Sequence, residues 1–380
     1  MRHEEPLWFN PASRVWMLTR YRDVVAVFEQ PDTYSNRVYE ASLGKVFGPT
    51  MLQMDGHDHV VRRTIIAPEV VGKRLDGYKA LIERNATKLI DRFRARGRFD
   101  LVHDFSTWLP VNVICDMLGL PDEDLPFFHD CYQAMMVGLG QDPALRRKGV
   151  EAAHAFSAYC APIVEQRRRE PGNDFISRIL TSEVDGQHLG DEEVRAFLAL
   201  LLTAGGETTD KAIANLWANL LANPDQRAAV AGEPALFEPA FSETMRHSFP
   251  VISQVRSVTH DVEWYGTTVP AGSIVHVSLG SANNDEQCFA DPRRFDLARA
   301  DLWLTKELRK GVDDGERFGH LGFGLGKHFC LGYEMARAEA VIGSQLLLDA
   351  CPNLRLAEGA DTTMTITGQT RSLPSLPVEF

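Results

Sequence analysis

The sequence lacks several features that would place it in a specialised class of protein. Its six cysteines are scattered and form no CxxC pair, which excludes a disulfide framework and a zinc module. Its longest strongly apolar run, Ala196 to Gly206, is about half of the ~20 residues that a membrane-spanning helix needs. The first residues are polar, are broken by Pro6 and Pro11, and show no secretory signal. These absences predict a soluble, cytoplasmic protein that does not insert into a membrane.

Positive charge is also in short supply. Lysine and arginine number 40 against 52 aspartate and glutamate residues, so the formal net charge is -12. Wholesale binding to nucleic acid or to an anionic membrane is therefore not expected. The chain has no internal repeat, low-complexity tract or linker, and 44% of its residues are hydrophobic. A single domain over residues 1–380 with a large buried core is predicted.

Helical periodicity dominates the pattern of apolar residues, with a minor β portion. The longest predicted helix runs from Asp191 to Asn223, with three acidic residues in its first turn and Gly205-Gly206 as a weak point at its centre. Residues 34–56 read as a long irregular segment of the kind that often lines a ligand site. Other helices are predicted over 23–30, 57–66, 78–96, 104–118, 122–138, 144–169, 173–183, 234–248 and 331–349. Strands are predicted in the parts 15–56, 255–280 and 362–380, the last as a hairpin of 362–367 with 376–380.

A glycine-rich loop with one cysteine is the strongest local signal. Residues 322–332 read GFGLGKHFCLG, with four glycines in eleven residues, which indicates unusual backbone angles or a close approach to another group. A phosphate cradle is the rival interpretation, but the loop lacks the Lys-Ser/Thr ending of a P-loop and the GxGxxG spacing. Cys330 stands just before a predicted helix, whose free N–H groups would stabilise a thiolate.

The run FGxGxHxCxG closely resembles the haem-binding loop of the cytochrome P-450 superfamily. The resemblance implies the fold of that family, a triangular helical prism with a long central helix over the haem and the cysteine loop below it. It implies haem b (iron protoporphyrin IX) as cofactor and Cys330 as its axial thiolate ligand, which donates electron density to the iron. Phe323 and Gly324 would pack beside the sulfur, and the N–H groups of Leu331 and Gly332 would tune it.

The segment AGGETT, residues 204–209, lies inside the long predicted helix. Its plain interpretation is a helical glycine pair with polar residues that face solvent. The segment also resembles the oxygen-activation segment of the family, in which the glycines, here Gly205 and Gly206, let the helix open for dioxygen; Ala204 and Gly205 would lie against the haem. By that resemblance Thr208 would hydrogen-bond the oxygen or a water molecule, and Glu207 would relay protons from solvent.

The family has two further sets of polar residues, and both have counterparts here. Glu243 and Arg246 form an ExxR pair, which alone is an ordinary helix ion pair; the resemblance makes Arg294 their third member and gives the three a structural role. The carboxylates of a haem need cationic or donor partners when they are enclosed. Four residues that would otherwise be surface charges match the positions of those partners: His59, Arg63, Arg256 and His328.

Two departures from the family are evident. The chain starts almost at its first strand, so the usual first helix is expected to be short or missing. The proline common at the entry of the third helix is absent from Asp55-Gly56-His57-Asp58, so the local loop is expected to differ.

Substrate contacts come from variable segments of the family, and each candidate could equally be a core residue. The candidates are apolar, which suits a terpenoid, steroid, fatty acyl or polyketide-like molecule. They are Val38, Phe47, Met51, Leu52, Met135, Leu200, Val251, Ile252 and Ile366.

The implied activity is that of a monooxygenase that hydroxylates or otherwise oxidises such a molecule with O₂. The chain has no flavin or Fe–S motif, so electrons would come from NAD(P)H through a reductase and a separate ferredoxin or flavodoxin, which Arg62, Lys73, Arg74 and Lys327 could attract. A monomer is expected. An H₂O₂-driven peroxygenase, a non-catalytic haem sensor or electron-transfer protein, and a dehydrating or rearranging enzyme are the alternatives.

Overall fold

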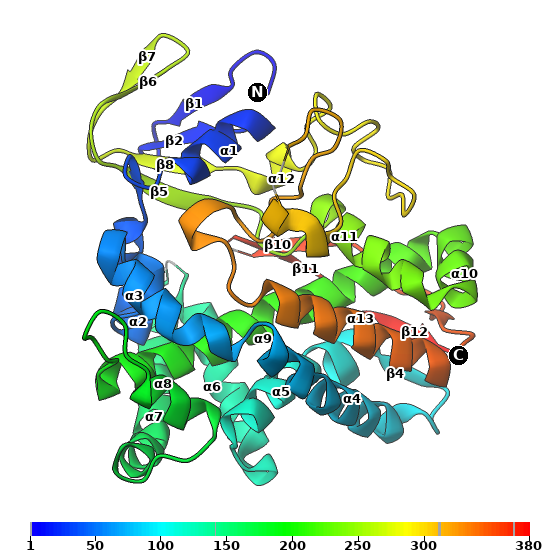
Figure 1. Cartoon of the computed structure of the whole chain (residues 1–380). Helices are drawn as coiled ribbons and strands as arrows, with labels where there is room; N and C mark the ends of the chain where they lie inside the picture. The colour runs from blue at the N-terminus through cyan, green and yellow to red at the C-terminus, as the bar shows by residue number, and fades with distance from the viewer. Residues whose placement is uncertain (1, 141, 311–312, 368) are drawn as a thin grey trace.

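A computed structural model describes residues 2–140, 142–310, 313–367 and 369–380. Helices form most of the molecule, and a small sheet lies along one side of it, away from the C-terminus (Figure 1). The expectation of a mainly α protein with a minor β portion is confirmed. No helix in the described part of the chain combines the length and apolar character that crossing a membrane requires.

The helical part is built around α9, which runs from Asp191 to Ala222 through the middle of the molecule (Figure 1). It packs against α5, α6, α7, α11 and α13, and α4 packs in turn against α5 and α13. The remaining α-helices are α1 (Tyr21–Glu29), α2 (Leu43–Phe47), α3 (Gly56–Ile66), α4 (Lys73–Phe93), α5 (Trp108–Leu118), α6 (Leu125–Gly138), α7 (Pro143–Arg169), α8 (Phe175–Thr181), α10 (Pro224–Gly232), α11 (Phe237–His247), α12 (Leu279–Ala282) and α13 (Tyr333–Ala350).

The glycine pair does not break the central helix. α9 continues through Gly205 and Gly206, although glycine costs about 1 kcal/mol relative to alanine inside a helix. Packing compensates, because a side chain at either position would approach Ile114 or Val111 of α5. The weak point predicted from the sequence is therefore a contact surface between helices.

The main sheet has five strands in the order β1-β2-β8-β5-β3. Only β2 and β8 pair in parallel; the other neighbours are antiparallel. β5 carries Arg256, which pairs in register with Val275 of β8. The strand β1, one residue after Pro6, was not anticipated. The strands are β1 (Leu7–Asn10), β2 (Val15–Leu18), β3 (Tyr34–Ser35), β5 (Gln254–Val258) and β8 (Ile274–Val277).

The predicted C-terminal hairpin is wrong in its pairing. β10 (Thr365–Thr367) pairs with β11 (Thr370–Ser372), and not with the last residues of the chain. The last strand, β12 (Pro377–Glu379), lies between β4 (Arg98–Asp100) and β9 (Arg355–Leu356). A strand that follows a hairpin can pair far along the chain, which periodicity does not reveal. β6 (Val262–Trp264) and β7 (Thr267–Val269) form a separate small hairpin.

Residues 34–56 are less irregular than the sequence suggested. Short helical turns cover residues 36–41 and 51–53, with α2 between them. The Asn36 side chain donates to the Leu52 carbonyl at 3.0 Å and closes the segment on itself. This segment therefore has a defined shape beside α7 and α9.

Two hydrophobic cores meet along α9. The N-terminal half of the helix, to Leu202, packs into a core with α3, α5, α6, α7 and α8. Its C-terminal half, from Ala212, packs into a core with α4, α11, α13 and the main sheet. Residues 203–211 lie between the two, and this junction contains the AGGETT segment.

Candidate active site

Cys330 differs from every other cysteine in the chain. Cys115, Cys131, Cys160, Cys288 and Cys351 are buried, whereas Cys330 is partly accessible. Its own N–H donates to the Phe323 carbonyl at 2.9 Å, which folds the loop back on itself. Burial raises the pKa of the Cys330 thiol, while the Gly332 N–H and the Arg63 charge act in the opposite direction. The protonated thiol is therefore favoured as the chain stands, and a cation bound to the sulfur would shift the balance toward the thiolate.

The glycines of this loop serve backbone geometry. Gly324 and Gly326 have φ angles of 68° and 71°, which residues with a side chain rarely adopt. A Cβ on Gly326 would lie only 2.4 Å from the Phe28 carbonyl oxygen of α1, so the loop can approach α1 only with glycine there. The rings of Phe323 and Phe329 lie 6.4 Å apart between centroids and cover the loop with apolar surface.

The four predicted cationic residues converge at one edge of the loop. The rings of His59 on α3 and His328 in the loop lie 4.0 Å apart between centroids. Arg63, one turn after His59, donates to the Phe329 carbonyl at 2.7 Å. Burial, together with neighbouring positive charge, lowers the pKa of His59 to about 4 and that of His328 to about 3. The Asp55 carboxylate lies 3.5 Å from the His328 ring nitrogen and opposes part of both shifts.

Arg256 gives the sharpest test of whether a carboxylate belongs here. The residue is 4% exposed, and burial lowers the pKa of its guanidinium. Its side chain donates to the Val255 carbonyl at 2.8 Å and to the Gln254 amide oxygen at 3.1 Å. Within the described ranges, no carboxylate lies at ion-pair distance from it. Tyr39 and Asp55 offset only part of the cost of burying this charge, so the residues present fit a ligand that brings its own carboxylates.

The donor set at Cys330 fits a haem better than a bare metal ion. Across the described residues, no cluster of three or more His, Cys, Asp or Glu side chains could hold a metal. A single thiolate next to partners for carboxylates suits an iron whose other ligands come from a porphyrin with two propionates. His59, Arg63, Arg256 and His328 would bind the propionates, and Cys330 would bind the iron.

One stripe of the central helix is accessible although the helix lies inside the molecule. Ala204 is exposed, and Leu201, Gly205 and Thr208 are partly exposed, between buried residues before and after them. The Thr208 hydroxyl donates to the Ala204 carbonyl at 2.7 Å. Its hydrogen is therefore engaged within the helix, and its oxygen is left to accept a hydrogen bond.

Glu207 has a partner that no sequence pattern indicated. The Tyr132 hydroxyl of α6 donates to the Glu207 carboxylate at 2.8 Å. Tyr132 falls within a helix that was predicted, but nothing in its spacing relates it to residue 207, 75 positions away. Asp210, one turn further along α9, accepts from Ser106 at 2.6 Å and pairs with Lys211 at 2.7 Å.

The prediction for the third member of the ExxR cluster is wrong. Arg246 forms two bonds of 2.7 Å to the Glu243 carboxylate, and both residues are buried. The side chain that joins them is that of Arg299, with Nε 3.2 Å from the Glu243 carboxylate. The Arg294 side chain is 66% exposed and contributes only its backbone carbonyl, which accepts from Arg246 and Arg299. Arg294 and Arg299 both follow Pro292. The path of the chain between them directs the Arg299 side chain, and not that of Arg294, toward Glu243.

Comparison with known proteins decides the family. The cytochrome P-450 profile matches residues 235–365. The pulcherriminic acid synthase of Bacillus subtilis (strain 168) is 32% identical over 94% of this chain and 88% of its own length. The vitamin D(3) 25-hydroxylase of Pseudonocardia autotrophica is also 32% identical, over 92% of this chain and 84% of its own length. A Bacillus megaterium structure in complex with testosterone superposes with a TM-score of 0.87 at 28% identity, covering 100% of this chain and 97% of that one.

The chain belongs to the cytochrome P-450 family. This cytochrome P-450 is a haem-dependent monooxygenase that uses O₂ and needs a redox partner. The expectations for family, fold class and enzyme class are confirmed.

The structure of this cytochrome P-450 separates the candidate substrate contacts into two groups. Val38 and Leu52 are partly accessible and lie in the segment that folds beside α9, and Val251 and Ile252 are partly accessible next to β11. The second group gives weaker candidates. Met135 is fully buried, with its sulfur 3.7 Å from the Thr203 hydroxyl. Phe47, Met51 and Leu200 are also buried, with exposed fractions of 5–8%. Ile366, by contrast, is 59% exposed.

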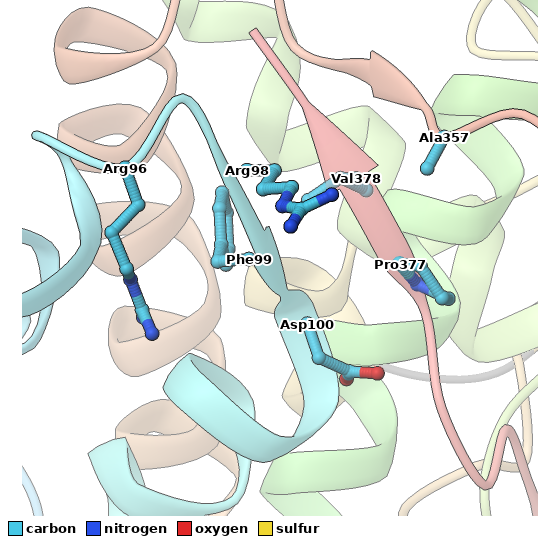
Figure 2. Close-up of a pocket in the computed structure, with 7 residues that line it drawn as sticks. All are labelled: Arg96, Arg98, Phe99, Asp100, Ala357, Pro377 and Val378. Carbon is cyan, nitrogen blue, oxygen red and sulfur yellow. The ribbon is translucent and has the colours of Figure 1, made fainter.

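A hollow of about 670 Å³ elsewhere on the molecule is not part of this site. It lies over β4 and β12 and is open to solvent. Figure 2 shows the strand of Arg98, Phe99 and Asp100 beside the strand of Pro377 and Val378, with Arg96 on the turn before it. Its Asp100 carboxylate accepts from the Val102 and His103 N–H groups, and Arg96 pairs with Asp104 at 3.2 Å. These polar groups are used to hold the local fold.

Proposed function

We propose that this cytochrome P-450 oxidises an uncharged, largely apolar small molecule, with haem b bound through Cys330. The observation that carries the proposal is a partly accessible cysteine, Cys330, near the buried Arg256 guanidinium, which has no carboxylate at ion-pair distance among the described residues. A bound haem supplies the activation of O₂ and the transfer of one oxygen atom to the substrate. The protein supplies the sulfur, the partners of the propionates and the apolar surroundings.

The assignment of Cys330 is tested by Cys330→Ala. Removal of the thiolate should abolish the long-wavelength absorption band of the reduced carbon monoxide complex, because that band depends on sulfur ligation. Cys288→Ala, which removes a buried cysteine of another segment, is the matched control and should keep the band. A variant without sulfur at position 330 that kept a normal band would refute the assignment.

For the proton relay, we propose that Glu207 and Thr208 work together. The Thr208 hydroxyl donates to the Ala204 carbonyl, so its oxygen would accept a hydrogen bond on the accessible stripe of α9, and the Glu207 carboxylate next to it would exchange protons with solvent. Thr208→Ala should retain the haem and divert electrons to hydrogen peroxide, whereas Thr208→Ser should restore most of the coupling. If electrons reached product equally well in the alanine variant, the relay would be wrong.

A comparison of turnover with H₂O₂ and with the carrier system separates this enzyme from a peroxygenase.

The substrate class rests on the apolar character of the accessible candidates. Val38, Leu52, Val251 and Ile252 carry no charge, and a named relative and a solved neighbour involve vitamin D(3) and testosterone. We therefore favour molecules of that kind, with a terpenoid, a fatty acyl chain or a polyketide-like compound as other members of the class. Titration of the haem-loaded protein with testosterone should shift the main haem band to shorter wavelength. Inertness toward every apolar ligand in a library would instead favour a sensor.

Electrons are proposed to come from an acidic ferredoxin or flavodoxin, reduced by an NAD(P)H reductase, that docks on a monomer near the cysteine loop. Lys327 and Arg74 are about half exposed there, with their nearest carboxylates at 3.7 and 3.9 Å. Arg62 is withdrawn from this set, because Glu193 holds its guanidinium at 2.9 Å and it is 18% exposed. Charge reversal of Lys327 and Arg74 should slow reduction and weaken its dependence on salt. Reversal of Arg147 and Lys148 on α7 is the control with the same change in net charge.

A further inference from the structure

The contact between Tyr132 and Glu207 joins α6 to the central helix α9. Tyr132 lies on α6 and is 2% exposed, and its hydroxyl donates to the Glu207 carboxylate at 2.8 Å. Among the described residues, this hydroxyl is the one hydrogen-bond donor to Glu207. The neighbouring Asp210, by contrast, is held by Ser106, Thr107 and Lys211.

The ring of Tyr132 has little freedom to move. A Cβ on Gly206 would lie 3.5 Å from two carbons of the ring and 3.1 Å from Val111, so the missing side chain gives the ring its place against α9. On another side, the His129 ring stands edge-on to it at 5.4 Å between centroids. His129 is itself within 3.2 Å of the Thr107 carbonyl. The absence of a side chain at Gly206 therefore leaves room for the Tyr132 ring. This face of α9 differs from the accessible stripe that carries Ala204 and Thr208.

The charges around the hydroxyl keep it a donor. Burial raises the pKa of Tyr132, and the nearby Asp210 and Glu207 carboxylates raise it further. Burial alone would lower the pKa of Lys211, but Asp210 and Glu207 reverse this and raise it. A donor that does not ionise can hold a carboxylate without competing for its proton.

We propose that Tyr132 is a positioning residue for oxygen activation: its hydroxyl fixes the Glu207 side chain beside Thr208 and makes that placement depend on the position of α6. This inference rests on the proposed proton relay of Glu207 and Thr208. It assigns no chemistry to Tyr132, which acts through Glu207.

Tyr132→Phe removes the hydroxyl and keeps the ring. The haem-loaded enzyme is supplied with NADPH, a surrogate reductase and ferredoxin, and O₂, with testosterone as an apolar probe. The ratio of hydrogen peroxide to water formed is measured. The ratio of peroxide to water formed should rise roughly tenfold, as expected for loss of one hydrogen bond to a charged group. The same substitution in a Glu207→Gln background should add nothing, because the partner is already changed.

A second measurement does not depend on turnover. In a double-mutant cycle of chemical denaturation, the midpoint shift of the Tyr132→Phe, Glu207→Gln variant should be smaller than the sum of the two single shifts. Tyr159→Phe is the matched control, since it removes a 2.7 Å bond from a tyrosine hydroxyl of α7 to the Asp124 carboxylate, which precedes α6. It should leave the ratio of peroxide to water unchanged.

The outcomes distinguish a failure of the role given to Tyr132 from a failure of the proton relay of Glu207 and Thr208. If Glu207→Gln changes the ratio of peroxide to water and Tyr132→Phe does not, or if the two substitutions simply add, Tyr132 has a structural role only and the inference is overturned. If Glu207→Gln itself leaves the ratio unchanged, the relay fails and the inference falls with it.

Discussion

Glu339 places a carboxyl group at a buried position of α13, nine positions after Cys330. The residue is 2% exposed, and its Oε1 has no hydrogen-bond partner in the described structure. Burial raises the pKa of this carboxyl to about 8. The folded protein therefore keeps the proton at neutral pH, whereas the unfolded chain releases it near 4.5.

The sign of the resulting pH dependence follows from proton binding. Between about pH 4.5 and 8 the folded state holds one more proton than the unfolded state at this position. The free energy of unfolding should therefore fall as pH rises through this window, by at most about 1.4 kcal/mol per pH unit. Glu339→Gln removes the titration, so the difference between variant and parent should grow steadily from pH 5 to pH 8. A difference that stays constant in denaturation curves across that range would contradict the prediction.

At the scale of the element, the central helix shows how packing offsets weak propensity. Gly206 faces α5 and α6 so closely that a Cβ would meet Val111 at 3.1 Å. Gly77 sits in an exposed part of α4, where a Cβ would meet nothing within 4 Å. The two glycines share a helical backbone and differ only in what surrounds them.

This difference predicts opposite effects of the same substitution. Gly77→Ala should raise the free energy of unfolding by up to ~1 kcal/mol, because alanine favours the helix. Gly206→Ala should lower it by about 1 kcal/mol, since overpacking outweighs the gain in propensity. Urea denaturation of both variants measures the two effects, and the prediction fails if Gly206→Ala is as stabilising as Gly77→Ala.

Helices and the cysteine loop were predictable because their signals are local. Apolar spacing predicted most of the helices and the long α9, and the glycine-rich run with Cys330 sits within eleven residues. The helix α10 was missed, and the pairing of β12 with β4 was missed because the partners lie far apart in the chain. The contact of Tyr132 with Glu207 was missed for the same reason. Each of these depends on how distant segments meet, which one sequence does not record.

At the scale of the whole molecule, the cluster of Glu243, Arg246 and Arg299 ties a long loop to α11. Arg246 donates to the carbonyls of Asn283 and Pro292 at 3.0 and 2.8 Å, and Arg299 donates to that of Ala290 at 2.6 Å. Two buried side chains thus hold the segment that leads toward the cysteine loop. Local spacing placed Glu243 and Arg246 correctly, but only the path of this segment selects Arg299 over Arg294.

Arg299→Ala should therefore lower the free energy of unfolding by about 2 kcal/mol, because it removes the donors to the Ala290 and Arg294 carbonyls and one of the two guanidinium partners of Glu243. The variant should also lose haem more readily, measured as the fraction of protein with the haem absorption band after purification. Arg294→Ala should change the free energy of unfolding by less than about 0.5 kcal/mol, since its side chain is in solvent. Equal effects of the two substitutions would show that the cluster has been assigned to the wrong arginine.

The guanidinium of Arg256, buried without an ion pair among the described residues, has a consequence for how this enzyme matures. Until a pigment with carboxylates arrives, the newly made polypeptide must carry a desolvated positive charge in its interior. Binding of the pigment then stabilises the native state in proportion to the logarithm of its concentration. Cells short of the pigment should accordingly accumulate less of the protein, since the unloaded form would unfold and be degraded first.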